Sequence, residues 1–300
     1  MIDNRWLHGY ALFVAIYAPV SIATGAGATA CRAGVSKPDW PVAYGQCLPF
    51  SRWLTALELL HTAVWALVTS AVIRLRAIAL REHRRSVKWL EYISLGLNPA
   101  QVSIRGAAVL LRLPTFVSAV DACLCQLCFG TLSVIASATG PSWTGTAEHV
   151  NDHGWPMVRA MVIWTPILVF IQILLGSLYR RRITGAVPHI VSALFVAGVV
   201  ILFSMFVLTQ FPAHETLKRA AIATLLIVFV QVMLGVFTYM IRLPATDERS
   251  SGPLTVFTTV AHVSVGGVLF VASILFGLEI RRNVLPKAAS IRQESLGALR

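Results

Sequence analysis

The chain has 300 residues, of which 56% are hydrophobic and 13% are charged, and its mean hydropathy is +0.72. Soluble domains carry about 25% charged residues, so this composition excludes a cytosolic enzyme, a disordered chain and a disulfide-rich secreted domain. Lys and Arg, 25 in all, outnumber the 13 Asp and Glu residues. In a membrane protein such an excess reflects cytoplasmic loops rather than nucleic-acid binding, so the sequence indicates a polytopic membrane protein.

Eight apolar stretches are each near the ~20 residues that a helix needs to cross the hydrocarbon core of a bilayer. Their backbone polar groups find no water there, so we expect helices rather than open strands. In chain order the stretches cover 7–29, 55–74, 89–111, 115–138, 158–179, 187–209, 219–241 and 254–279. The predicted fold class is an all-α integral membrane protein with eight transmembrane helices.

The distribution of Lys and Arg predicts which side of the membrane each connection faces. The densest run of basic residues lies between Arg74 and Lys88, in the connection between the second and third spans. The positive-inside rule places this run in the cytoplasm, and with eight spans both termini are then cytoplasmic. No long leader rich in Arg and Ser precedes Trp6, so the predicted location is a bacterial plasma membrane.

An internal repeat relates two parts of the chain. Residues 101–114 and 231–244 both begin with Gln-Val and end with Arg-Leu-Pro, at an offset of 130 residues. The two segments end the third and seventh spans on the outer side, which is the pattern of a tandem duplication of a four-helix unit. Each unit has an even number of spans, so the two copies keep the same orientation in the membrane.

The duplication predicts the domain organisation, as two tandem four-helix bundles. An N-terminal four-helix half is followed by a cytoplasmic linker, a C-terminal four-helix half and a cytoplasmic tail. The respective bounds are 1–140, 141–157, 158–283 and 284–300. The linker contains a cluster of acidic residues and histidines, but its Gly and Pro content favours a solvated loop over a metal site. Sites in one half are expected to have counterparts in the other.

Titratable side chains within the apolar spans form the candidate functional site, because charged groups in hydrocarbon are costly and mark function. They are Glu58 and His61 in the second span, Asp121 in the fourth, His189 in the sixth and His262 in the eighth. All lie within about 14 Å of the outer helix ends, at 1.5 Å per residue. Two histidines at matching depth suit the ligation of a haem in a bundle, which we predict for His189 and His262. An ordinary interhelical hydrogen bond is the alternative for a single histidine.

Several segments resemble the haem A synthase family, and the resemblance covers nearly the whole chain. Pro-Asp-Trp-Pro at 38–41 and Glu-Leu-Leu-His at 58–61 are its most specific part, and the segments at 111–114, 188–189 and 260–262 continue it. The resemblance implies an oxidoreductase that oxidises a methyl group of haem O to a formyl group, giving haem A for cytochrome oxidase assembly. The implied partners are the lipid bilayer, haem O, haem O synthase and cytochrome oxidase subunits, and a homo-oligomer stays open.

The resemblance also implies roles for individual residues. In the family the N-terminal half holds the substrate haem, as haem O or its product haem A, and the C-terminal half holds a haem b. Carried over to this chain, His61 is a ligand of the substrate haem iron, and Glu58 is the carboxylate that moves protons or stabilises positive charge on the methyl carbon. His189 and His262 are then the two ligands of the haem b iron.

The chain departs from the family pattern around the substrate haem. The family has a second His at the start of the fourth span, where this chain has Asp121, and small Gly residues in the third span, where this chain has Ser103 and Arg105. The hairpin of these spans turns near Leu113, so we predict that Arg105 and Asp121 meet at equal depth as a buried ion pair. The competing interpretation is that Asp121 is itself an iron ligand, or that it leaves the iron five-coordinate, as suits a site that binds and activates oxygen. A haem-binding membrane cytochrome or assembly factor with impaired catalysis is therefore the alternative function.

The five cysteines fall into two sets. Cys31 and Cys47 flank the Pro-Asp-Trp-Pro segment on the predicted outer side, where a disulfide is permitted, and some members of the family carry a pair in this loop. Cys123, Cys125 and Cys128 lie within the fourth span. We expect these three to be small apolar fillers of a packed helix.

Overall fold

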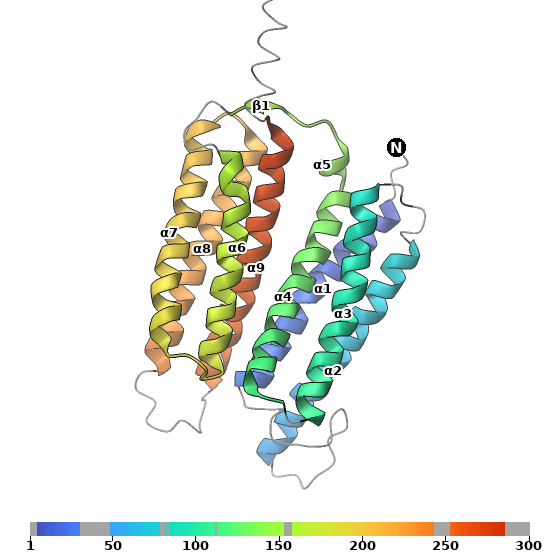
Figure 1. Ribbon diagram of the computed structural model, residues 1–300, viewed down its shortest axis with the longest axis vertical. Helices are drawn as coiled ribbons and strands as arrows, with labels where there is room; N and C mark the ends of the chain where they lie inside the picture. The colour runs from blue at the N-terminus through green and yellow to red at the C-terminus, as the bar shows by residue number, and fades with distance from the viewer. Residues whose placement is uncertain are drawn as a thin grey trace, which may run out of the picture.

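The computed structural model describes residues 5–30, 49–78, 82, 84–111, 113–152, 158–242 and 253–285, without the side chains of 28, 49–59, 62, 109–110, 144 and 242. Long helices dominate this part of the chain and form two groups that stand side by side (Figure 1). The first group consists of α1 (Arg5–Ala30), α2 (Pro49–Ile78), α3 (Arg85–Leu110) and α4 (Thr115–Thr139). The second consists of α6 (Val158–Arg180), α7 (Ala186–Gln210), α8 (Glu215–Arg242) and α9 (Pro253–Asn283).

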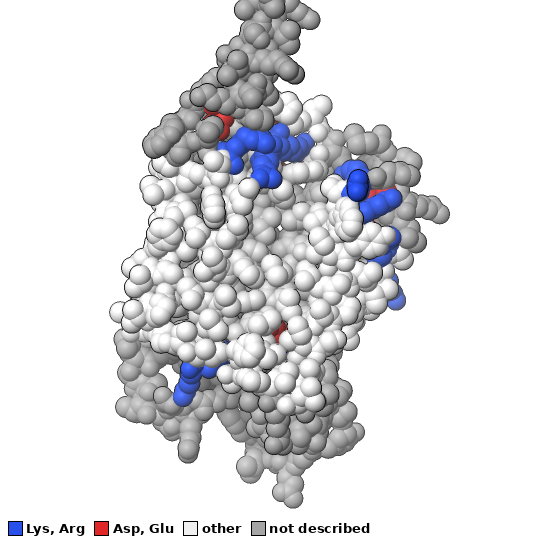
Figure 2. All heavy atoms as spheres, viewed as in Figure 1, with Lys and Arg blue, Asp and Glu red and all other residues white. Residues whose placement is uncertain are grey.

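Six of the helices in the described residues are long and apolar enough to cross a membrane. They are α1, α4 and the four long helices of the second group. Figure 2 shows a broad uncharged surface over the middle of the molecule, with Lys and Arg gathered toward the ends of the helices. The described part of the chain is therefore that of an all-α, multi-pass membrane protein. The eight spans and the duplication stay predictions, although α2 and α3 have 30 and 26 residues.

Each group is a closed ring of four helices. In the first group α1 and α3 each contact α2 and α4, and in the second group α6 and α8 each contact α7 and α9. Between the groups α1 packs on α9, α4 packs on α6, and α4 packs on α9. This arrangement makes α4 and α9 the central helices, and their apolar segments are the most buried of the six candidate spans, at 67% and 50%.

Large apolar side chains fill the interior of both rings, where dispersion contacts and close packing stabilise the helices. Leu132 is fully buried in the first group, and Phe203 and Phe276 pack with ring centroids 5.1 Å apart in the second. A close approach brings α6 against α9, because a Cβ atom on Gly277 would lie 2.9 Å from Val162 Cγ1. Small residues at such crossings are the usual means by which membrane helices pack closely.

The described part of the segment between the two groups, up to Asp152, contains short regular elements where its composition predicts a loop. It contains α5 (Pro141–Thr144) and β1 (Val150–Asn151), and β1 pairs in parallel with β2 (Val284–Leu285). Arg282 at the end of α9 donates to the carbonyl oxygens of Ser142 at 2.6 Å and Gly145 at 2.8 Å. Asp152 is buried rather than solvated. The predicted tail, residues 284–300, therefore begins with β2, which pairs with β1 of the linker. Local composition does not reveal such a contact between distant segments.

Candidate functional site

Four of the predicted site residues lie toward the ends of the helices that are opposite the N-terminus (Figure 1). His61 and Asp121 belong to α2 and α4 of the first group, and they are buried. His189 and His262 belong to α7 and α9 of the second group, and they are half-buried. The structure thus distributes these residues over two sites, one in each ring of helices.

His189 and His262 lie opposite each other in the second group. Their ring centroids are 6.4 Å apart and the ring planes are nearly perpendicular, at 86°. Two metal–nitrogen bonds of about 2 Å each, and about 1 Å from each nitrogen to its ring centre, add up to about 6 Å. The separation therefore fits two imidazoles that hold one metal ion between them.

Both of these histidines pack over a glycine of the preceding helix. A Cβ atom on Gly176 of α6 would lie 2.8 Å from His189 Cε1, and one on Gly235 of α8 would lie 3.0 Å from His262 Cε1. Non-bonded carbon atoms in contact are about 3.5–4.0 Å apart, so a larger residue at either position displaces the ring. The two glycines are parts of the site that inspection of the ionisable residues alone misses.

His61 of the first group also packs over a glycine of the preceding helix. A Cβ atom on Gly25 of α1 would lie 2.8 Å from His61 Cε1, and Thr24 Oγ1 lies 2.9 Å from His61 Nδ1. The Thr24 hydroxyl donates to the backbone oxygen of Val20 or Ser21, so it accepts the hydrogen of Nδ1. Nε2 is buried and has no hydrogen-bond partner in the described part of the structure. A metal-binding histidine has this arrangement, with one ring nitrogen held and the other available.

The ring of His189 is held from two sides. Tyr179 stacks on it with centroids 6.1 Å apart, and Gln172 Nε2 lies 2.9 Å from both His189 Nδ1 and the His189 carbonyl oxygen. In this arrangement His189 Nδ1 accepts a hydrogen bond from the Gln172 amide, so the single proton of the neutral imidazole lies on Nε2. A metal at Nε2 requires that proton to lie on Nδ1, so the Gln172 amide must then present its oxygen.

The ion pair that the third and fourth spans predict is present. Arg105 Nη1 lies 3.4 Å from Asp121 Oδ2. A second cation comes from the other group, because the charge of Arg181, just after α6, also acts on Asp121. Burial lowers the pKa of Arg181, whereas the Asp121 carboxylate raises it. Arg181 also donates to the Ser118 carbonyl oxygen at 3.2 Å, so Asp121 stands where arginines of both groups converge.

Three predicted site residues lie outside what the structure describes. Cys31 and Cys47 fall outside the described residues, so their disulfide stays a prediction. Glu58 belongs to α2, but its side chain is outside the description, and its position beside His61 also stays a prediction. The three cysteines of α4 are buried thiols, as the packing interpretation requires. The described residues contain no cluster of three His, Cys, Asp or Glu side chains that could hold a metal ion.

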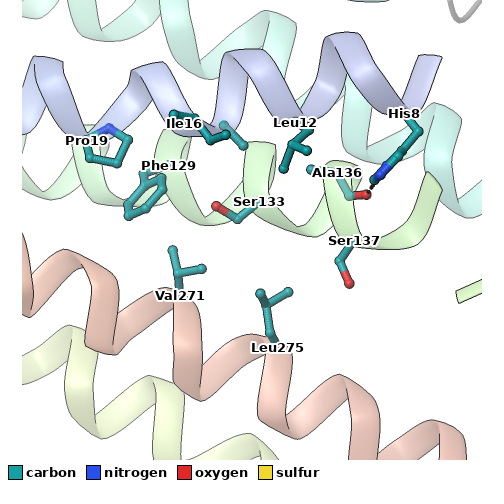
Figure 3. A pocket seen from close by; sticks show the side chains of 11 residues that line it. His8, Leu12, Ile16, Pro19, Phe129, Ser133, Ala136, Ser137, Val271 and Leu275 are labelled. Atoms are coloured by element: carbon teal, nitrogen blue, oxygen red, sulfur yellow. Dashed lines mark hydrogen bonds between the residues drawn. The ribbon is translucent and has the colours of Figure 1, made fainter. Parts of the chain in front are cut away.

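A separate cavity of about 460 Å³ lies between the two groups, bounded by α1, α4 and α9 (Figure 3). Its lining is almost wholly apolar. His8 stands at one end, where its Nδ1 donates to the Ala136 carbonyl oxygen at 3.0 Å. None of the site residues His61, Asp121 and His262 contributes to this lining, so the cavity is distinct from both histidine sites.

No family model matches the chain, and no curated protein matches it either. The class of protein is therefore defined by its fold and site alone. The chain is a helical membrane protein with a histidine site in each of two rings of helices.

Proposed function

We propose that the chain is a haem-binding membrane oxidoreductase of the haem A synthase type, which oxidises a methyl group of haem O to a formyl group. This step takes up one oxygen atom, from water, and releases four protons and four electrons, the electrons to an external acceptor of the quinone or dioxygen class. The observation that carries the proposal is the pair His189 and His262, whose ring centroids are 6.4 Å apart, a separation at which the two imidazoles would hold the iron of one haem. Gly176 and Gly235 behind the two rings leave them room. On this proposal the second group holds a haem b, and the first group receives haem O.

The proposal includes eight spans in a bacterial plasma membrane, with both termini in the cytoplasm, and two groups that arose by duplication. The helix contacts support the duplication, because α1 on α9 and α6 on α4 are equivalent contacts. The glutamines of the repeat support it too. Gln101 reaches Cys125 of α4, and Gln231 reaches Gly266 of α9, where a Cβ atom would lie 3.1 Å from the Gln231 Nε2 atom.

The chain's own residues have distinct tasks in this proposal. His189 and His262 would hold the haem b iron, and the haem would supply a redox centre when bound. Gln172 fixes the orientation of the His189 ring through its hydrogen bond. In the first group His61 offers Nε2 to the iron of the substrate haem. Glu58 comes one helical turn before His61 in α2, and its carboxylate accepts a proton or stabilises positive charge on the reacting carbon.

The test is co-expression with a source of haem O in a host that lacks its own haem A synthase, followed by extraction and chromatography of the haems. Haem A above the background of the empty host supports the enzyme. His189→Ala and His262→Ala should each abolish haem b binding, whereas His149→Ala, which changes an exposed linker histidine, should leave it intact. A chain that binds no haem refutes the proposal.

A second candidate function is a haem-binding cytochrome or oxidase assembly factor without catalytic activity. The Arg105–Asp121 ion pair favours it, because a charged pair occupies the place where the family has an iron ligand. The same experiment separates the two functions. Haem B without haem A, with binding lost in His189→Ala, supports the second candidate over the first.

A further inference from the structure

The two groups of helices share a glutamine and a histidine that packs over a glycine, but different residues hold the Nδ1 atom of that histidine, and two further positions differ. Each group has a glutamine at the same place in the repeat, Gln101 in α3 and Gln231 in α8. Four residues later, about one helical turn along the same face, α3 has Arg105 and α8 has Gly235. The position that leaves room for a histidine ring in the second group is therefore an arginine in the first.

The second difference lies on the facing helix. The two glutamines contact Cys125 of α4 and Gly266 of α9, and these contacts align the two helices. Asp121 precedes Cys125 by four residues, just as His262 precedes Gly266 by four. Asp121 of the first group therefore stands where the second group has its histidine. In the first group an arginine and an aspartate therefore stand at the positions of this glycine and this histidine, and they form an ion pair.

The other requirements of a two-histidine site are met in the first group. His61 packs over Gly25 as His189 packs over Gly176. Its Nδ1 is held by Thr24, and its Nε2 is buried without a hydrogen-bond partner among the described residues. On the side that faces α3 and α4, the Arg105 guanidinium and the Asp121 carboxylate lie 3.4 Å apart.

We propose that the Arg105–Asp121 ion pair replaces the second axial ligand in the first group, so that this group holds no haem between two histidines. Arg105 and Asp121 are the residues that close the first site to a second histidine ring. The inference rests on the proposed binding of haem in the second group. It assigns Arg105 and Asp121 as the residues that determine how many bis-histidine haems one chain carries.

The test converts the first site into the second with the double variant Arg105→Gly/Asp121→His. The protein is purified in detergent and loaded with haemin, and low-spin haem per chain is measured by electron paramagnetic resonance and by pyridine haemochrome absorbance. The wild type should carry a single low-spin haem, which His189→Ala removes. The double variant should double the low-spin signal, and adding His61→Ala should remove the gain.

Two results overturn the inference. One is a wild type that carries two low-spin haems, and the other is a folded double variant whose signal does not rise. Should the double variant fail to fold, His61→Ala in the wild-type background decides. Full retention of the low-spin signal supports the inference, and loss of half of it contradicts it. Failure of the proposed function looks different, because the wild type then binds no haem at all, or its haem binding survives in His189→Ala and His262→Ala.

Discussion

The contact between His189 and Gly176 gives a prediction that needs no bound haem. Gly176→Ala adds a Cβ atom 2.8 Å from His189 Cε1, where carbon atoms in contact need about 3.5–4.0 Å. The ring must therefore retreat by about 1 Å. Gln172 lies 2.9 Å from the ring nitrogen, and Tyr179 stacks on the ring, so the ring cannot move without disturbing both contacts.

Three free-energy terms set the size of the effect. Overpacking in a well-packed interior costs about 1–3 kcal/mol, and the stretched hydrogen bond to Gln172 costs about 1 kcal/mol more. Alanine in a helix is more stable than glycine by about 1 kcal/mol, which offsets part of the loss. We expect Gly176→Ala to lower the free energy of unfolding by about 1–3 kcal/mol and to weaken haem retention.

Gly198→Ala in α7 is the matched control, because a Cβ atom there meets nothing within 4 Å. This variant should gain about 1 kcal/mol from helix propensity alone. The free energy of unfolding of both variants is measured by denaturant titration in detergent micelles. If Gly176→Ala proves as stable as Gly198→Ala, the ring of His189 does not rest against α6, and the predicted contact between Gly176 and His189 is refuted.

The remaining predictions concern side chains that hold other groups in place. Gln172→Leu should weaken haem binding about 10- to 100-fold, as measured by haemin titration, and unchanged affinity would show that the amide does not orient the ring. Arg105→Met should destabilise the chain by about 3–5 kcal/mol, because it leaves the Asp121 carboxylate without its partner. Arg105→Met/Asp121→Leu should be close to neutral in thermal unfolding. Equal losses of stability in both variants would contradict the pairing. Arg282→Ala should speed proteolysis of the linker by removing two bonds to its carbonyl oxygens, while Arg281→Ala, which changes an exposed side chain, should not.

Hydropathy predicts where the helices lie better than where they end. The span predicted at 115–138 matches α4 within one residue, because Pro114 and the preceding turn mark its start. The span predicted at 55–74 is shorter than α2, which continues to Ile78 through Arg74 and Arg76. Long basic side chains can extend their charge toward water while the helix goes on. Apolar composition therefore marks the buried part of a helix, and the polar turns at its ends escape it.

The pairing of Arg105 with Asp121 could be predicted because both belong to one hairpin, whose turn fixes their relative depth. The packing of histidines over glycines could not be predicted in the same way, because Gly25 and His61 lie on two different helices, 36 residues apart in the sequence. The sequence did contain a signal for Gly235, because the repeat aligns this glycine with Arg105. Arg181 escaped prediction because its contact with the first group depends on how the two rings dock.

The position of Asp121 explains how the first site can differ from the second without unfolding the bundle. An isolated buried carboxylate is strongly disfavoured, and a substitution of histidine by aspartate alone would leave one. Arg105 supplies a cation from the same hairpin, and Arg181 supplies another from the second group. An apolar pair of similar size would be as stable or more so, so stability does not account for the choice of charges. If the second group binds haem as proposed, the two charged residues occupy the place of a second histidine ring, and His61 is the single histidine of the first site among the described residues.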